Sequence, residues 1–330
     1  MTHPRGSSDR PPRRPRADSA RRTPPPAAGG NAGGKPAAGR RAGRGGRADA
    51  ATVSIPPGKP VGPRGGDAGA ATPRRHATRA EQKVHGVRAC EALFARRPGD
   101  VIRVYVSASR KPTFKKLLEH CATRRLGFQI VDGASLDRLA GGLHHEGIVI
   151  LAREPERPGT AALLAGVADG TIRGPLVYLD GVQNPHNLGS ILRSAAHFGC
   201  GAVIGAAGDL PPLSAAAMRV AEGGAEFVRL FALDDPPAAL AALGRAGLSR
   251  VTTTSRTGDP VAAAGLTRDV VLILGSEAEG VSPRISKLAD RRVRIPGSGN
   301  VQSLNVAVAA GIVLAEACRG TGRGPDAAGE

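Results

Sequence analysis

Glycines and polar residues suited to ligand binding follow a short apolar stretch in the segment Val293-Arg-Ile-Pro-Gly-Ser-Gly-Asn-Val-Gln-Ser-Leu-Asn-Val-Ala-Val-Ala310. The pattern predicts a strand end at 293–295, a glycine-rich loop, and an apolar helix that begins near Ser303. A strand that leads through such a loop into a helix is a common frame for a small-molecule site. A dinucleotide is disfavoured, because the run G-x-G-x-x-Q lacks the third glycine and no acidic residue follows at the expected spacing.

A second candidate segment is Leu179-Asp-Gly-Val-Gln-Asn-Pro-His-Asn-Leu-Gly-Ser-Ile-Leu-Arg-Ser-Ala-Ala-His-Phe-Gly199. If its helix begins at Leu188, Asn187 is a good N-cap and Arg193 lies on the second turn. Arg193 stands among apolar residues, so it would point towards a cleft, where a phosphate is its natural partner. Two simpler interpretations stay open: Asn187 is only a cap, and Arg193 is a surface ion pair.

The third segment, Leu272-Ile-Leu-Gly-Ser-Glu-Ala-Glu-Gly-Val-Ser-Pro283, is an apolar strand that ends in glycine and acidic residues. Gly275 would let the backbone approach a ligand closely. Glu277 stands at the mouth of the strand, where a carboxylate can orient an arginine or a ribose hydroxyl. The alternative is an N-cap or first-turn acid beside the dipole of a following helix.

In this order and spacing the three segments resemble the SpoU (TrmH) branch of the SPOUT RNA 2′-O-methyltransferases, over about residues 174–320. Residues 82–153 more weakly resemble the substrate-binding domain of the 23S rRNA guanosine members. The resemblance implies that backbone groups of the second and third loops hold S-adenosylmethionine (SAM) in a bent shape. The cofactor-binding residues it implies are Gly275, Ile295 and Leu304, the two apolar side chains enclosing the adenine; both could equally be ordinary core.

The implied reaction is transfer of a methyl group from a sulfonium to a ribose 2′-oxygen. The catalytic residues implied by the resemblance are Arg193, Asn187, Glu277, Ser303 and Asn305. In the family proposal Arg193 accepts the 2′-hydroxyl proton, although a guanidinium has a reference pKa above about 12. Either a bound phosphate network perturbs it, or Arg193 stabilises developing oxyanion charge while the proton leaves elsewhere. Ser303 and Asn305 would position the ribose or Arg193.

The elements around these segments alternate between helix and strand, which predicts two α/β units. The first, 81–153, has expected strands at 101–106, 128–131 and 147–152, and helices within 84–94, 111–125 and 135–139. The resemblance implies that this unit is L30e-like. Its loops His85-Gly86 and His144-His145-Glu146-Gly147 resemble positions of the substrate-binding domain. A proline- and alanine-rich linker, 154–173, follows.

The second unit, 174–321, has expected strands at 176–179, 202–204, 227–230, 251–253, 270–274 and 293–295, and a helix at 187–198. Such alternation predicts a mostly parallel sheet with helices on both faces, whose sites lie at the carboxyl ends of strands. All three segments fall at such ends. The resemblance adds a trefoil knot, which periodicity does not show.

Composition separates the ends of the chain from these units. Residues 1–80 hold 17 Lys and Arg against 4 Asp and Glu, a net +13 of the chain's +18, with few large apolar residues. This composition predicts a disordered basic tail that contacts RNA phosphates, or one that only aids solubility. Residues 322–330 are expected to be a second disordered tail.

The remaining composition limits the class of protein. Cys90, Cys121, Cys200 and Cys318 are too widely spaced for a zinc site or a disulfide framework, so we expect no metal. No secretory signal and no apolar run long enough for a bilayer is found, which favours the cytoplasm and no membrane. Aromatic residues make up 2% of the chain, so RNA recognition should rest on phosphates and shape.

We therefore predict a SAM-dependent RNA ribose 2′-O-methyltransferase that acts on a guanosine of 23S rRNA. The alternatives are a tRNA ribose methyltransferase and a catalytically silent RNA-binding assembly factor. The helix 303–318 is apolar on nearly every side, more than one sheet face needs. In the family this helix packs at a dimer interface, so we also predict a homodimer.

Overall fold

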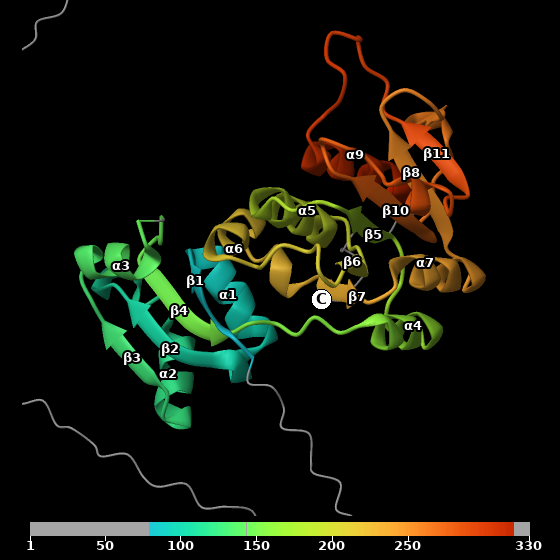
Figure 1. The fold of residues 1–330 in the computed structure, drawn as a ribbon. Helices are drawn as coiled ribbons and strands as arrows, with labels where there is room; N and C mark the ends of the chain where they lie inside the picture. The colour runs from blue at the N-terminus through green and yellow to red at the C-terminus, as the bar shows by residue number, and fades with distance from the viewer. Residues whose placement is uncertain (1–78, 143, 320–330) are drawn as a thin grey trace, which may run out of the picture. The chain divides into compact units, whose positions relative to one another are not determined.

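The computed structural model describes residues 79–142 and 144–319. The two predicted tails therefore lie outside the described residues, apart from Arg79 and Ala80. The described residues form two sheets, each with helices on both faces, which confirms the α/β class (Figure 1). Among these residues, no helix is long and apolar enough to cross a membrane.

The first sheet has the order β1-β4-β2-β3. Its strands are β1 (Glu81–His85), β2 (Val101–Val106), β3 (Gly127–Ile130) and β4 (Ile148–Arg153). β4 pairs antiparallel with β1 and β2, whereas β2 and β3 are parallel. Helices α1 (Val87–Arg96) and α2 (Lys115–Arg124) contribute to one apolar core, and α3 (Gly133–Ala140) packs with Val149 in a separate cluster. The three strands expected in this unit are confirmed.

The expected helix within 84–94 was wrong at its start, because residues 81–85 form the unpredicted strand β1. Gln82 and Val84 are buried while Glu81 and Lys83 are exposed, an alternation typical of a strand. Gly86, with φ of 91°, separates this strand from α1. A conformation with positive φ is one that glycine adopts readily, so the helix begins only after it.

The second sheet is parallel throughout its described pairings, in the order β7-β6-β5-β10-β8-β11-β9. Its strands are β5 (Leu176–Asp180), β6 (Ala202–Ala206), β7 (Arg229–Leu233), β8 (Ser249–Thr254), β9 (Asp259–Pro260), β10 (Val270–Gly275) and β11 (Arg291–Arg294). The strand expected at 227–230 begins two residues later, since the 3₁₀ turn η3 (Gly224–Glu226) precedes it. The two-residue strand β9 was not predicted.

Two apolar layers sandwich this sheet. The helices are α4 (Thr160–Ala168), α5 (Pro185–His197), α6 (Ala215–Ala221), α7 (Pro236–Arg245), α8 (Pro283–Ser286) and α9 (Val306–Cys318). Val177 and Leu179 of β5 belong to the core that includes α5, α6 and α9. Leu176 and Tyr178, the alternate residues, belong to the core of α4 and α7. The run 176–179 is apolar throughout because both faces of β5 are covered.

The sheet order decides which loops can meet. β5 and β10 are neighbours, so the loops after them start side by side, but β8 separates β10 from β11. The connection from β11 to α9 is exposed from residue 296 to residue 305 and extends away from the sheet before it returns to α9 (Figure 1). This return brings the start of α9 to the end of β10.

Contacts between α1, β1 and the α6–η3 segment join the two sheets. Arg97 binds Glu226 through two hydrogen bonds, Nε to Oε2 at 2.5 Å and Nη2 to Oε1 at 2.9 Å. Arg219 of α6 pairs with Glu146 at 3.5 Å. We call these four residues, together with the buried His85, the junction.

Candidate active site

Helix α5 begins one turn earlier than expected. Asn184 is its N-cap, because the side-chain oxygen accepts the His186 N–H at 2.9 Å, and Pro185 is the first helical residue. The prediction that Asn187 caps the helix was therefore wrong. The pair Asn-Pro carried the missed signal, since proline is favoured directly after a cap. Asn187 lies within the first turn, and its side chain is available for another contact.

Glu277 makes that contact. Its Oε1 accepts the side-chain amide of Asn187 at 3.2 Å, the side-chain amide of Asn305 at 2.5 Å and the backbone N–H of Val306 at 3.3 Å. One carboxylate in the loop after β10 therefore links the start of α5, which follows β5, to the start of α9, which follows β11. Hydrogen bonds to an ionised acceptor are the stronger kind.

Asn305 is the N-cap of α9, so the helix starts at Val306 rather than near Ser303. Its Oδ1 accepts the N–H groups of Ala307 at 2.9 Å and Val308 at 3.3 Å. The amide nitrogen then donates to Glu277 and to Asn187 Oδ1, the latter at 3.0 Å. The side chain of Asn305 is thereby fixed at both ends, which orients the start of α9 towards α5.

Glu277 is not the N-cap or first-turn acid of a helix that follows β10. Residues 276–280 form a tight turn, in which the Gly280 N–H donates to the Ser276 carbonyl at 2.9 Å, and α8 begins only at Pro283. A Cβ on Gly275 would lie 2.0 Å from the Gly280 carbonyl carbon. The turn's own backbone, rather than a ligand, thus makes the close approach that requires glycine at 275.

Asp180, at the end of β5, was not singled out from the sequence. Its Oδ2 accepts the Ser282 N–H at 2.6 Å and so attaches the loop after β10 to the neighbouring strand. Beneath it, burial raises the pKa of Tyr178, and the Asp180 charge adds to the effect. Tyr178 therefore stays neutral, and it is a buried residue of the core beneath the site. An acid directly after an apolar strand was the available signal for Asp180.

Arg193 lies on the exposed side of α5, with 58% of its side chain accessible, and pairs with Glu222 through Nη2 and Oε2 at 2.9 Å. It also lines an open groove of about 530 Å³ between α5, α6 and α9. The lining residues are Ser190, Arg193, Ser194, Phe198, Val220, Asn305, Ala307, Val308, Gly311 and Ile312. The surface ion pair is present, and the same side chain shares a groove with Asn305.

The remaining predicted residues lie along the β11–α9 connection. Ile295 packs partly against the core, as either interpretation allowed. Leu304 is 43% exposed, so it is not ordinary core. Ser303 is exposed and makes no side-chain hydrogen bond with the described residues. An exposed leucine directly before the Asn305 cap gives this loop an apolar surface next to polar groups.

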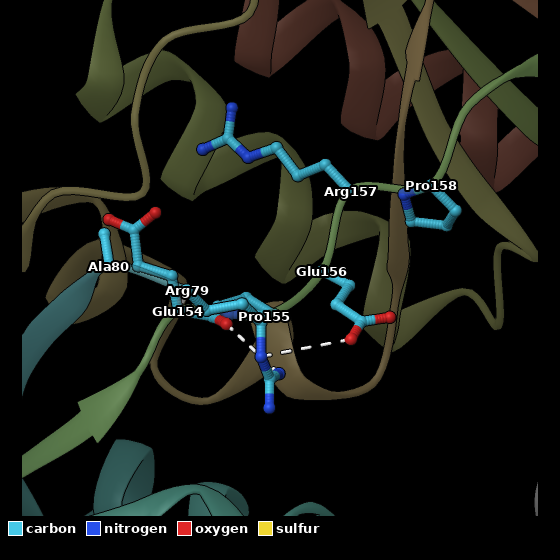
Figure 2. Close-up of a pocket in the computed structure, with 7 residues that line it drawn as sticks. All are labelled: Arg79, Ala80, Glu154, Pro155, Glu156, Arg157 and Pro158. Atoms are coloured by element: carbon cyan, nitrogen blue, oxygen red, sulfur yellow. Dashed lines mark hydrogen bonds and ion pairs between the residues drawn. The ribbon is translucent and has the colours of Figure 1, made fainter. Parts of the chain in front are cut away.

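A second hollow, of about 390 Å³, lies where β1 begins and β4 ends. Figure 2 shows its lining: Arg79, Ala80, Glu154, Pro155, Glu156, Arg157 and Pro158. Arg79 donates to the Glu154 carbonyl at 3.3 Å and lies 3.9 Å from Glu156 Oε1. None of the three sequence segments reaches this hollow. Its two arginines bind groups outside the lining as well, Arg79 the Asp100 carboxylate and Arg157 the Pro211 carbonyl.

Within residues 79–142 and 144–319, no group of three or more His, Cys, Asp and Glu side chains could hold a metal ion. The site is instead built from amides, one carboxylate, one guanidinium, and loop backbone. Such groups bind and orient polar molecules and can stabilise developing negative charge.

Comparison with known proteins shows which families the chain resembles. Residues 174–315 match the SpoU rRNA Methylase family, and residues 83–158 match the family described as RNA 2′-O ribose methyltransferase substrate binding. The chain is 39% identical over 237 residues to the uncharacterized tRNA/rRNA methyltransferase YfiF of Escherichia coli O157:H7, covering 72% of this chain and 67% of that protein.

Two further comparisons agree. The 23S rRNA (guanosine-2′-O-)-methyltransferase RlmB of Burkholderia sp is 34% identical over 237 residues, covering 72% of this chain and 95% of that protein. The SpoU methyltransferase AviRb of Streptomyces viridochromogenes, solved in complex with the cofactor AdoMet, shares the fold with a TM-score of 0.59 and 24% identity, covering 72% of this chain and 90% of that one.

The fold and the two matched regions define an RNA methyltransferase with its own substrate-binding region. The chain belongs to the SpoU rRNA methylase family. It is a SAM-dependent RNA 2′-O-ribose methyltransferase, and the predicted family and enzyme class are confirmed.

Proposed function

We propose that this enzyme methylates the ribose 2′-oxygen of a guanosine in 23S rRNA. The observation behind the proposed site is the convergence of Asn187, Glu277 and Asn305, which joins the segments that follow three parallel strands at their carboxyl ends. Support for the target comes from the RlmB proteins, which match this chain over nearly their whole length. A tRNA ribose is the alternative target.

The residues present fit the cofactor. SAM supplies an electrophilic methyl group, and we propose that the backbone at Gly275 and the side chains of Ile295 and Leu304 hold it. The exposure of Leu304 beside polar loop groups supports this assignment, since an adenine face needs an open apolar surface. Glu277 and Asn305 would keep the two loops in register around the ligand.

Arg193 is proposed to stabilise the negative charge that develops on the 2′-oxygen as its proton leaves. It is exposed and lines the same groove as Asn305, so a nucleotide can reach it. Asn187 and Ser303 would position the ribose or Arg193. A guanidinium held in place before the reaction supplies this kind of stabilisation without reorganisation during the step.

The test of the function is methyl transfer from labelled SAM to rRNA and tRNA taken from a strain that lacks the gene. Labelling of one 23S rRNA guanosine is expected, and ribose-methylation mapping of the deletion strain should show that position unmodified. Labelling of tRNA alone would favour the alternative target. Transfer to neither RNA at saturating SAM would contradict the proposed function.

We further propose a homodimer through α9. The supporting feature is Val308 of α9, an apolar side chain that is 52% exposed. It lines the groove together with Ile312 and Phe198. An apolar patch of this kind favours a protein partner. Light scattering at micromolar concentration tests it, and a monomer mass would contradict it.

The finer points of architecture are also proposals. We propose boundaries at 81–153, 154–173 and 174–321, an L30e-like first unit, and a trefoil knot in the second, supported by the out-of-sequence neighbours β10, β8 and β11. An experimental structure traced through residues 81–318 tests all three. We propose a cytoplasmic location, where rRNA is methylated, which cell fractionation tests.

The basic residues 1–80 are proposed to be an RNA-binding arm, on the strength of their +13 charge. Deleting them should flatten the salt dependence of RNA binding by about one unit for each phosphate that the arm neutralises. An unchanged slope would show that the arm does not bind RNA.

A further inference from the structure

Glu222 has an unusual backbone for its side chain. It is the C-cap of α6 and adopts a left-handed conformation with φ of 44°, which among the described non-glycine residues only Arg125 and Glu146 share. Helices usually place glycine or asparagine in this conformation, because a Cβ is strained there. A glycine does follow, at 223. The strained position is nevertheless occupied by a glutamate, which indicates a role for its side chain.

The side chain of Glu222 reaches Arg193. Its Oε2 lies 2.9 Å from Nη2 of Arg193, and 42% of the glutamate side chain is accessible. A guanidinium has five N–H donors in a fixed plane, so a carboxylate at one edge fixes the direction of the others. Arg193 meanwhile lines the groove that also contains Asn305.

The backbone around Glu222 is held on both sides. A Cβ on Gly223 would lie 2.8 Å from the Ala92 Cβ in α1, and one on Gly224 would lie 2.9 Å from the Arg193 Cα in α5. The segment 219–226 therefore fits closely between α1 and α5, with room only for glycine at these two positions. Its other charged residues, Arg219 and Glu226, pair with Glu146 and Arg97.

We propose that Glu222 is a positioning residue for Arg193, held in its strained conformation by the junction so that the guanidinium faces the groove in one orientation. The inference rests on the proposed methyl transfer by this site. Contacts with the substrate-binding region would then help to set the orientation of Arg193.

Glu222→Gly and Glu222→Asn separate this role from a structural one. Both replacements suit a left-handed backbone better than glutamate does, so the thermal midpoint should stay the same or rise. Both lack a carboxylate that reaches Arg193. We expect kcat to fall about tenfold, with SAM affinity unchanged, as for removal of a partly exposed charge-assisted hydrogen bond. Glu222→Asp, which keeps a shorter carboxylate, should lie in between.

A double-mutant cycle assigns the effect to Arg193. In an Arg193→Ala background, Glu222→Gly should cause no further decrease in kcat, because the group it positions is gone. The control is Glu119→Gln. The Glu119 side chain is exposed and pairs only with Lys115, at 3.8 Å, among the described residues. Glutamine is used here because glycine would weaken the helix. Full kcat in both Glu222 variants, or an equal decrease in the Arg193→Ala background, would overturn the proposal.

A second measurement does not depend on turnover. The Nε–Hε NMR signal of Arg193, identified by its absence in Arg193→Ala, should shift in Glu222→Gly. A wild-type enzyme that transfers no methyl group would count against the proposed function, and an unmoved signal would count against Glu222 independently.

Discussion

Two glutamates of the segment 219–226 form ion pairs with arginines, Glu226 with Arg97 and Glu222 with Arg193, and the two pairs differ in burial. In the junction, the side chains of Arg97 and Glu226 are 14% and 1% exposed and share two hydrogen bonds. In the candidate active site, Arg193 and Glu222 share one contact and are 58% and 42% exposed. A buried pair is costly to break because one charge is left without water or partner, whereas an exposed pair adds little stability. We therefore expect the junction pair to contribute mainly to stability, and the proposed role of the Arg193–Glu222 pair is orientation.

Breaking the junction pair should have the largest effect. In Glu226→Ala, Arg97 still has Asp100 and the Arg153 carbonyl as partners. The free energy of unfolding should therefore decrease by about 3 kcal/mol, the low end for breaking a buried pair. Urea unfolding followed by circular dichroism measures it. The matched control is Glu119→Ala in the exposed pair with Lys115, for which we expect less than about 0.5 kcal/mol. Equal decreases in the two variants would remove the distinction between buried and exposed pairs.

Arg193→Ala should give the opposite pattern. Methyl transfer should fall roughly a hundredfold or more, as for removal of one preorganised donor to a developing oxyanion, while the urea midpoint stays within error. Arg193→Lys should rescue poorly, because an ammonium keeps the charge without the planar fork. Arg284→Ala, an exposed arginine paired with Asp235 at 3.9 Å, is the control. Near-normal turnover in Arg193→Ala would leave the residue as a surface ion pair only.

Glu277 should affect both stability and methyl transfer. Its carboxylate accepts hydrogen bonds from the side-chain amides of Asn187 and Asn305, and it also caps the start of α9 at Val306. In Glu277→Gln the side-chain oxygen can still accept from Asn187, Asn305 and Val306, but without the negative charge. We expect a decrease of about 1 kcal/mol in unfolding free energy and about a tenfold decrease in transfer. The control is Glu279→Gln in the same loop, which should be neutral in both assays. An effect confined to stability would make Glu277 a cap alone.

The sequence predicted the buried strands well and the contacts between units poorly. Residues 176–179 and 270–274 are apolar because both sheet faces are covered, and this pattern is local. The strand β1 was missed because Val84 is its only apolar residue, although Gln82 and His85 are buried as well. That Asn187, Glu277 and Asn305 meet depends on the sheet order β5-β10-β8-β11, which single-sequence periodicity does not contain. Whether these residues bind and react as predicted stays a prediction.

Sequence patterns could not show the ion pairs of Glu226 in the junction and of nearby Glu222, for a similar reason. Glu222 and Glu226 read as ordinary surface acids, and their partners Arg193 and Arg97 lie far away in the chain. The available hint was the run Glu222-Gly223-Gly224 after an apolar helix, which is typical of a left-handed helix end. The hint gives the backbone conformation but not the partner.

The smallest expected effect is a pH dependence that belongs to the junction and not to the site. His85 is buried, and burial lowers its pKa below the ordinary value of 6.5; Arg219 and His145 lower it further, while the His144 backbone and Glu146 oppose them. Below pH 6.5 the unfolded chain binds a proton that the folded protein does not, so stability should fall as the pH falls from about 7.5 to about 5.5.

In His85→Gln this part of the pH dependence should vanish, so the difference in thermal midpoint between the two pH values should be smaller than in the wild type. Glu146 does not confuse the test. Its pKa is lowered from 4.5, chiefly by the hydrogen bond from the Val87 N–H, so the stability it contributes disappears only at lower pH. His186→Gln is the control, because His186 lies exposed at the start of α5. The opposite result, in which His186→Gln removes the pH dependence and His85→Gln does not, would contradict this prediction. The pH-dependent stability would then come from the start of α5 in the candidate site and not from the junction.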